Sequence, residues 1–156
     1  MRLTKYGHSC LLVEEGPARL LLDPGTLSGG FEELEGLTAV LVTHQHGDHL
    51  DLQRPRMLLD RNPGGPGALR RGQRRAARRG RRGGRGRTRR GGTGGRRGRG
   101  ARRGRDHAVI HPDIPVVPNV GYLVGGRLFH PGDAFTPPGR PVEVLAVPAG
   151  APWLKV

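Results

Sequence analysis

Four side chains that can bind a metal ion stand within six residues of one another. They are His44, His46, Asp48 and His49, and they follow an apolar run over residues 39–43. Three of the chain's seven histidines fall in this cluster, which argues against a polar loop with chance histidines. Imidazole nitrogens and a carboxylate oxygen are ligands that Zn²⁺ or a similar divalent metal accepts. The cluster therefore predicts a metal site at the carboxyl end of a buried strand.

The cluster resembles the signature of the metallo-β-lactamase-fold superfamily, His-x-His-x-Asp-His after a buried strand. The resemblance implies that His44 and His46 bind a first metal ion, while Asp48 and His49 bind a second. It implies one or two zinc ions as the cofactor, with manganese as an alternative.

The activity that the resemblance implies is hydrolysis of a small-molecule substrate. A bound metal activates water for attack on an ester, lactone or phosphoester, and Asp48 is the catalytic residue that orients the water or accepts its proton. The opening residues Tyr6-Gly7-His8-Ser9 and the turn Leu22-Asp23-Pro24-Gly25 resemble more specifically the ascorbate-6-phosphate lactonase-like branch.

Two segments further along the chain extend the resemblance. Asp106-His107 matches the family's histidine after a strand, which makes His107 the expected third ligand of the first metal. His130-Pro131-Gly132-Asp133 matches the family's Gly-Asp after a hairpin, which makes Asp133 the expected bridging carboxylate.

The remaining histidines carry weaker signals. His111 is the alternative to His107 and faces either substrate or solvent. His130 either orients Asp133 from behind or is a structural histidine. His8 is expected in the pocket wall or in a structural role rather than as a ligand. Asp23, which precedes Pro-Gly, is expected to cap a turn beneath the site.

One block of the sequence differs from the rest in composition. Residues 64–105 hold 18 Arg and 15 Gly with no Lys and no acidic residue, a charge of +18. The other residues hold 9 Lys and Arg against 13 Asp and Glu, a charge of −4. Leu69 is the only sizeable apolar side chain in the block, so burial cannot offset its ordering entropy. We expect the block to be disordered.

Two hypotheses explain this block. It occupies about the interval that an intact family member needs between His49 and His107, which suggests a stretch of a GC-rich gene read in the wrong frame. Resequencing the gene tests that hypothesis. The alternative is an Arg/Gly-rich segment that binds RNA non-specifically through salt-dependent contacts, and loss of RNA binding on deletion of 64–105 would support it. A third interpretation is that the chain is a non-functional fragment.

The flanking segments, 1–63 and 106–156, are expected to form parts of one domain. Apolar runs bounded by Gly and Pro predict strands over 2–6, 9–14, 18–22, 39–43, 121–124, 128–129 and 142–147. Gly125-Gly126 predicts a two-residue hairpin, and residues 51–61 a helix with Pro55 in its first turn. The predicted fold class is α/β (α+β), and the resemblance implies an incomplete αββα sandwich of the metallo-β-lactamase type.

Further expectations concern features that the sequence lacks. The family's last ligand is a histidine near the C-terminus, and no His follows His130, so we expect weak or absent binding of a second metal by Asp48, His49 and Asp133. No signal-peptide pattern and no apolar run of about 20 residues is present, which predicts a cytoplasmic protein without a membrane partner. The single cysteine, Cys10, excludes an intrachain disulfide and is expected to be a buried strand residue.

Overall fold

The first sheet begins as a meander of short strands. The computed structural model describes residues 1–63, 101–103 and 106–154. Strands β1 (Arg2–Lys5), β2 (Leu11–Glu15) and β3 (Ala18–Leu22) pair antiparallel in sequence order, as predicted. Strand β4 (Ala39–Leu41) then runs parallel to β3, with Val40 opposite Leu21. Because parallel strands end at the same edge of a sheet, the loops that follow β3 and β4 lie beside each other.

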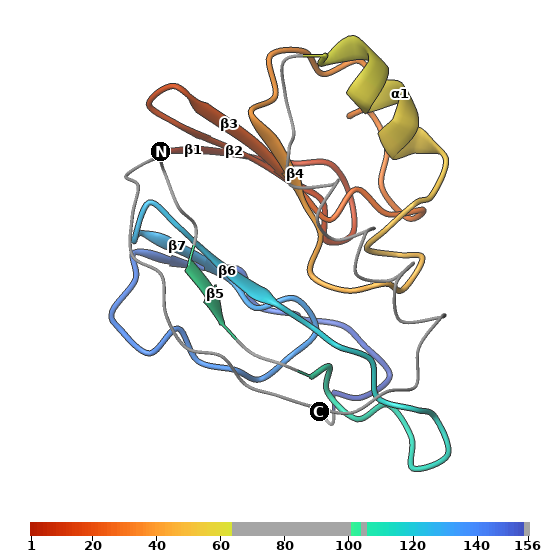
Figure 1. Ribbon diagram of the computed structural model, residues 1–156. Helices are drawn as coiled ribbons and strands as arrows, with labels where there is room; N and C mark the ends of the chain where they lie inside the picture. The colour runs from red at the N-terminus through yellow and green to blue at the C-terminus, as the bar shows by residue number, and fades with distance from the viewer. Residues whose placement is uncertain (64–100, 104–105, 155–156) are drawn as a thin grey trace, which may run out of the picture.

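Helix α1 (Arg54–Arg61) covers the outer face of this sheet (Figure 1). It begins three residues later than predicted, because the Asp51 carboxylate accepts hydrogen bonds from the backbone N–H groups of Gln53 and Arg54, at 2.7 and 3.2 Å. Pro55 lies in the first turn, as predicted, where its missing N–H leaves no intrahelical bond unmade. Leu58 is the buried side chain that the helix contributes to the core.

The second sheet repeats the strand order of the first. Strands β5 (Ala101–Arg103), β6 (Gly121–Val124) and β7 (Leu128–His130) pair antiparallel, and β8 (Val144–Leu145) runs parallel to β7. The predicted hairpin between β6 and β7 is confirmed. Its turn requires positive φ at both central positions, and Gly125 and Gly126 have φ of 59° and 73°.

Two cores lie on opposite faces of the first sheet, because successive side chains of a strand point to opposite sides. The core beneath α1 contains Cys10, Leu12, Leu21, Phe31, Leu37, Val40 and Leu58. The core between the two sheets contains Val13, Leu22, Tyr122, Val124 and Leu128. Burial raises the pKa of the Cys10 thiol to about 12, which agrees with an unreactive buried residue. Cys10 is not itself a strand residue as predicted, because β2 begins at Leu11.

The described residues therefore form two mixed sheets and one helix, which agrees with the predicted mixture of strands and helix. Only the first sheet has an outer helix within the described residues. The predicted disordered block lies outside them apart from residues 101–103, which pair with β6. Among the described residues, no helix is both long and apolar enough to span a membrane.

Candidate metal centre

The histidine cluster lies in the loop that leaves β4, as predicted, and backbone hydrogen bonds tie this loop to its surroundings. The N–H of Thr26 donates to the Gly47 carbonyl at 2.8 Å, and the N–H of Asp51 donates to the Pro24 carbonyl at 3.1 Å. The loop is also joined to the second sheet, since the Val120 N–H donates to the Thr43 carbonyl at 2.9 Å. The ligand-bearing loop is thus fixed from both halves of the molecule.

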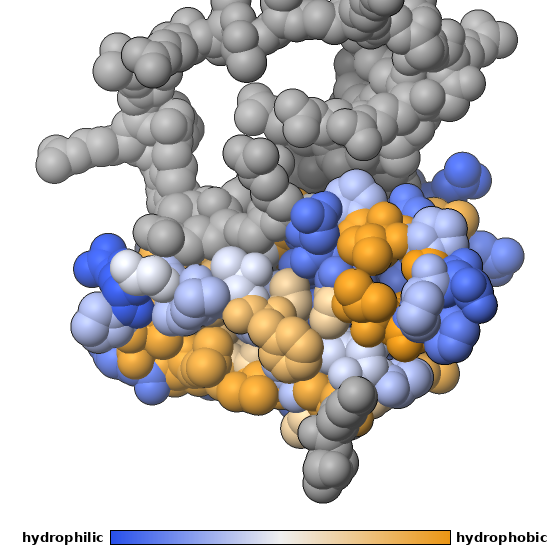
Figure 2. Space-filling view, turned by 90° about the horizontal axis from the view of Figure 1, so that it is seen from below, coloured by the Kyte–Doolittle hydropathy of each residue, from blue (hydrophilic) through white to orange (hydrophobic). Residues whose placement is uncertain are grey.

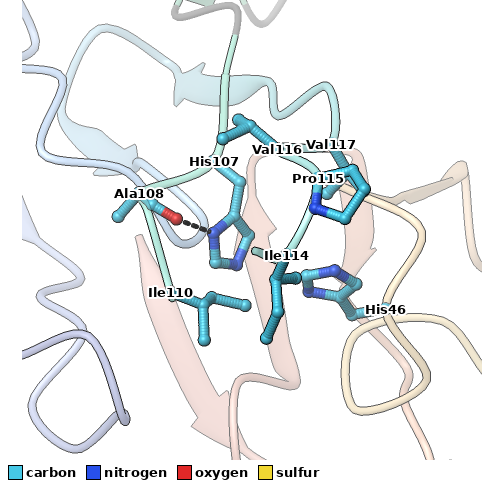
Figure 3. A pocket seen from close by; sticks show the side chains of 8 residues that line it. All are labelled: His46, His107, Ala108, Ile110, Ile114, Pro115, Val116 and Val117. Atoms are coloured by element: carbon cyan, nitrogen blue, oxygen red, sulfur yellow. Dashed lines mark hydrogen bonds between the residues drawn. The ribbon is translucent and has the colours of Figure 1, made fainter. Parts of the chain in front are cut away.

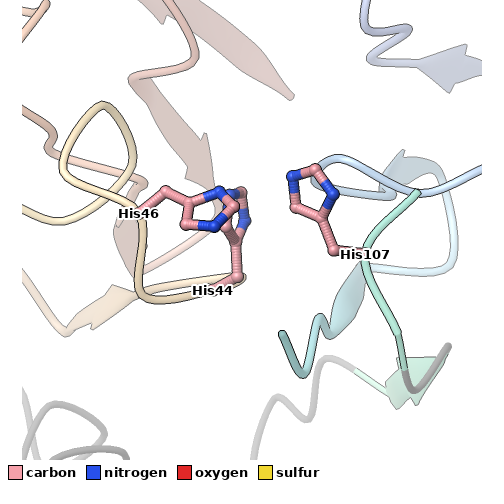
Figure 4. Close-up of side chains that lie close together, drawn as sticks. All are labelled: His44, His46 and His107. Carbon is pink, nitrogen blue, oxygen red and sulfur yellow. The ribbon is translucent and has the colours of Figure 1, made fainter. Parts of the chain in front are cut away.

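Three histidines from both halves meet at the interface between the sheets. His44 and His46 come from the loop after β4, and His107 approaches them from the second half (Figure 4). Each offers a ring nitrogen, and these nitrogens lie within 4.8 Å of one another. His44, His49 and Asp133 form a second such group. The structure therefore brings together expected ligands that precede and follow the Arg/Gly-rich block at 64–105.

The hydrogen bonds of three buried histidines, His44, His49 and His107, occupy Nδ1 and leave Nε2 without a hydrogen-bond partner. Thr43 Oγ1 lies 2.8 Å from an Asp23 carboxylate oxygen, to which it donates, so that it accepts from Nδ1 of His44 at 3.0 Å. Nδ1 of His49 donates to Asp23 at 2.8 Å, and Nδ1 of His107 to the Ala108 carbonyl. This network assigns the free lone pair to Nε2 in each neutral ring. The Nε2 atoms of His44, His49 and His107 are buried without a hydrogen-bond partner.

Such orphaned nitrogens fit a metal ion better than a purely structural role. Buried polar atoms normally have partners, and leaving one unpaired costs about 1–3 kcal/mol. Three unpaired imidazole nitrogens beside a carboxylate are the donor set of a borderline divalent metal. Metal-binding histidines also commonly donate their other ring N–H to a carboxylate or a carbonyl, as these three do to their neighbours directly or through a hydroxyl.

Asp23 is the hidden centre of this arrangement. Its side chain is fully buried, and its oxygens accept hydrogen bonds from the backbone N–H and hydroxyl of Thr43, from His49 and from Nε2 of His130, at 2.7 to 2.8 Å. Burial opposes its ionisation, but these donors outweigh burial and hold the pKa of the carboxyl well below its usual range. The sequence predicts Asp23 only as a residue that caps a turn beneath the site. The only signal for its role is that it follows three leucines of a buried strand.

The acidic and basic groups polarise one another in the metal-free site. Burial lowers the pKa of His49, but Asp133 and Asp23 outweigh burial and raise it to about 10. Burial and the positive charge of His49 lower the pKa of His44 to about 3. The pKa of Asp133 is lowered by the surrounding histidines despite its burial. Asp23 and Asp133 thus favour the protonated form of His49, and a metal ion at Nε2 would compete with that proton.

Asp133 lies between the two groups of histidines. Its Oδ1 is 3.3 Å from Nε2 of His49, and its Oδ2 is 3.4 Å from Nε2 of His107. Asn119, which is fully buried, holds this loop, since it accepts from the Asp133 N–H at 3.2 Å and donates to the Pro131 carbonyl at 2.8 Å. Nothing in the sequence pattern singles out Asn119, because its role depends on the folded loop.

Asp48 and His8 occupy the more open side of the site. Their side chains are 33% and 32% exposed, and Nε2 of His8 lies 3.1 Å from Oδ2 of Asp48. The structure also groups these two residues with His49 as side chains whose ligand atoms lie within 4.8 Å of one another. His8 was expected in the pocket wall or in a structural role, but its ring nitrogen lies among the potential ligand atoms of Asp48 and His49.

His130 and His111 each had two predicted roles, and for each the structure disagrees with one of them. His130 contacts Asp23 rather than Asp133, so its expected role behind Asp133 is corrected to a role behind His49, through the carboxylate that both rings share. His111 is 61% exposed and pairs with Asp113, and it belongs to none of the ligand groups among the described residues. Of its two predicted alternatives, the structure shows the one that faces solvent.

A small pocket opens beside the first group of histidines. His46 and His107 form one side of it, and the rest is lined by Ala108, Ile110, Ile114, Pro115, Val116 and Val117 (Figure 3). Trp153 packs against His107, with ring centroids 5.8 Å apart, and against Phe135 at 5.1 Å. The surroundings of the first site are therefore largely apolar.

Comparison with known proteins identifies the family. The model of the beta-lactamase superfamily domain matches residues 2–155. The chain belongs to this superfamily.

Among curated proteins, Protein Rv0786c of Mycobacterium tuberculosis is 48% identical over 161 aligned residues, which cover all of this chain and 74% of the relative. Two shorter matches cover 32% of this chain and 24% of each relative: "UPF0173 metal-dependent hydrolase mll0680" of Mesorhizobium japonicum, 46% identical over 56 residues, and the "UPF0173 metal-dependent hydrolase" of Chelativorans sp., 51% identical over 57 residues. No solved structure matches the chain significantly.

Proposed function

We propose that the protein is a metal-dependent hydrolase that uses zinc and acts on an ester, a lactone or a phosphoester. The observation that carries the proposal is the set of buried, unpartnered Nε2 atoms of His44, His49 and His107, which converge with Asp133 from two halves of the chain. Two relatives whose names describe metal-dependent hydrolases support it.

The proposed division of the ligands follows the distances. His44, His46 and His107 would hold the first ion, and Asp48 and His49 would hold the second. Asp133 would contribute to both sites, since each of its oxygens faces a different histidine. When bound, the metal acidifies water and stabilises negative charge on the attacked group.

The other roles belong to the side chains of the chain itself. Asp48 stands on the open side of the site, where a carboxylate can orient the attacking water or accept its proton. Asp23 and Thr43 fix the ring orientation and tautomer of His49 and His44, so that both Nε2 atoms stay aimed at the site. The side chains beside His46 and His107 are mostly apolar, which lowers the polarity of the surroundings of the first site.

Apolar side chains are also exposed around this region. Phe135 and Val109 are 70% and 62% exposed, and Ile114 and Val116 are close to half exposed. Figure 2 shows apolar residues gathered in patches on the face seen from below, between hydrophilic ones. This surface supports a substrate that carries apolar groups, because an apolar rim favours such groups of an approaching substrate.

Two structural proposals accompany this function. We infer that the domain is an αββα sandwich, in which α1 covers the first sheet. The Tyr6-Gly7-His8-Ser9 segment supports membership of the ascorbate-6-phosphate lactonase-like branch.

A substrate panel tests the proposal. The zinc-loaded full chain is assayed on p-nitrophenyl esters of increasing acyl length, on lactones and on bis(p-nitrophenyl) phosphate, beside the His44→Ala/His46→Ala variant and Asp48→Asn. We expect hydrolysis of at least one class, reduced to background in the double variant and strongly in Asp48→Asn. Equal rates for the wild-type protein and the double variant on every substrate would contradict the proposal.

A further inference from the structure

We infer that His8 is a ligand of the second metal ion. The sequence assigns this site only Asp48, His49 and Asp133, and the resemblance gives His8 no metal-binding role. The inference rests on the proposed metal-dependent function and adds a nitrogen donor from the turn after β1.

The first observation is the spacing of the potential donor atoms. Nε2 of His8 lies 3.1 Å from Oδ2 of Asp48, which lies 3.8 Å from Nε2 of His49. Nε2 of His49 in turn lies 3.3 Å from Oδ1 of Asp133. Ligands bound tetrahedrally to zinc at about 2.0–2.2 Å lie about 3.3–3.6 Å apart. These three successive distances are close to the edge length of a zinc coordination tetrahedron, and the ligand atoms of His8, Asp48 and His49 all lie within 4.8 Å of one another.

The second observation is the unpaired buried nitrogen at the centre of this group. The side chain of His49 is 2% exposed, and its Nε2 has no hydrogen-bond partner. Its other nitrogen is occupied by Asp23, so Nε2 is the atom that remains for a ligand. The rings of His8 and His49 are arranged edge to face with centroids 5.5 Å apart, so the two side chains are direct neighbours.

The third observation is that the backbone around His8 is fixed. The Tyr6 N–H donates to the Cys10 carbonyl at 2.9 Å and closes the turn that carries His8. Gly7 forms a bridge to Ser28, and its φ of 89° favours glycine at this position. The hydroxyl of Ser9 donates to the Asp48 carbonyl at 3.4 Å. The turn is thus tied directly to the loop that carries Asp48, as a preorganised ligand requires.

An exposed ion pair between His8 and Asp48 is the competing explanation, and such pairs contribute little to stability. Replacement of His8 by glutamine distinguishes a metal ligand from an ion-pair partner of Asp48. Glutamine can keep a hydrogen bond to Asp48, but its amide is a poor ligand for zinc. His8→Gln therefore preserves a pure positioning role and removes a ligand.

The experiment measures zinc binding to the full chain by elemental analysis after dialysis and by calorimetric titration. We expect about two zinc ions per chain for the wild-type protein, and for both His8→Ala and His8→Gln a weakening of one site by at least about 10–100-fold, the loss typical of even an outer-shell substitution. His111→Ala is the matched control, because His111 is exposed and outside every ligand group, and it keeps both ions.

Unchanged zinc binding in His8→Ala, or in His8→Gln alone, overturns the inference and leaves the first site and the proposed function intact. Absence of zinc from the wild-type protein overturns the proposed function as well. Circular dichroism confirms that each variant is folded, and the cobalt-substituted protein gives a second readout, because loss of a nitrogen ligand changes its visible absorption spectrum.

Discussion

The two halves of the molecule, each built on one sheet, have the same strand order but carry different functional side chains. Each sheet has three antiparallel strands and a fourth strand parallel to the third. The third strand of the first half is followed by Asp23-Pro24-Gly25, whereas that of the second half ends at His130 and is followed by Pro131-Gly132. Asp23 and His130 meet across the interface at 2.8 Å. After the fourth strand, the first half carries four ligand candidates, whereas the second carries Trp153, which packs on His107.

The same strand order can therefore carry most of the potential metal ligands in one half and mainly residues that position them in the other. The first half supplies most of the metal-binding groups. The second half supplies His107 and Asp133, and through His130 it helps to hold the carboxylate that orients His49. The site therefore depends on contact between the halves, because neither contains a full set of ligands.

The largest effect is expected from Asp23, the residue that both halves share. Asp23→Asn removes a buried charge that accepts four hydrogen bonds, and breaking a buried pair of this kind costs about 3–5 kcal/mol. Urea unfolding in the presence of a chelator measures the loss. Asp60→Asn, an exposed replacement on α1, is the control and should leave stability unchanged. A loss below about 1 kcal/mol would show that Asp23 does not join the halves.

A second prediction uses pH to isolate the contribution of His49 in the first half. Its folded pKa is raised to about 10, so its contribution to the stability of the chelated protein is fully present below the unfolded pKa of about 6.5. This contribution is lost as pH rises through the folded value, with a slope of at most about 1.4 kcal/mol per pH unit. Unfolding free energies measured between those pH values should fall in the wild-type protein and fall less in His49→Gln. Parallel curves would refute the prediction.

The two Pro-Gly turns allow a direct comparison of the halves. A Cβ at Gly25 would overlap the backbone carbonyl of Asp48, whereas one at Gly132 would lie 2.4 Å from Asn119 and 2.6 Å from the Thr43 side chain. Alanine at either position is expected to cost about 1–3 kcal/mol. The cost at Gly25 comes from overlap with backbone, which yields less than side chains, and at Gly132 from side-chain overlap together with the strain of a φ of 63°. Unfolding midpoints and zinc content are the measurements.

Gly126→Ala is the control for the turn variants, since Gly126 has a positive φ and open space around it. It should cost only the backbone strain, about 1 kcal/mol, and leave zinc content unchanged. If Gly25→Ala behaves like this control, the close approach between the turn and the ligand loop is not important for the site.

The smallest effect is expected from Trp153, which follows the fourth strand of the second half. Trp153→Ala removes aromatic contacts with His107 and Phe135, worth about 0.5–1.5 kcal/mol beyond burial. Zinc stoichiometry should stay unchanged, while KM for substrates with apolar groups should rise more than kcat falls. Loss of zinc in this variant would mean that Trp153 positions His107, and the second half would then shape the site more than we propose.

The sequence predicted most of the strands and the position of the histidine cluster after β4, because apolar runs, Gly-Gly and closely spaced histidines are local signals. It did not predict β5, which lies in the block expected to be disordered. It did not predict the roles of Asp23 and Asn119, since these depend on residues far apart in the chain that meet only after folding. It also gave no reason to place His8 beside Asp48, 40 residues away. The helix began later than predicted because a side chain, Asp51, replaced the first turn.

The central claim is that the two halves assemble a metal site across the Arg/Gly-rich block. The most direct test is elemental analysis of the purified full chain after zinc loading and dialysis, beside His44→Ala/His46→Ala. The account predicts at least about one zinc ion per chain in the wild-type protein and loss of the ion held by these histidines in the variant. Wild-type protein that is folded and binds no zinc would contradict the account.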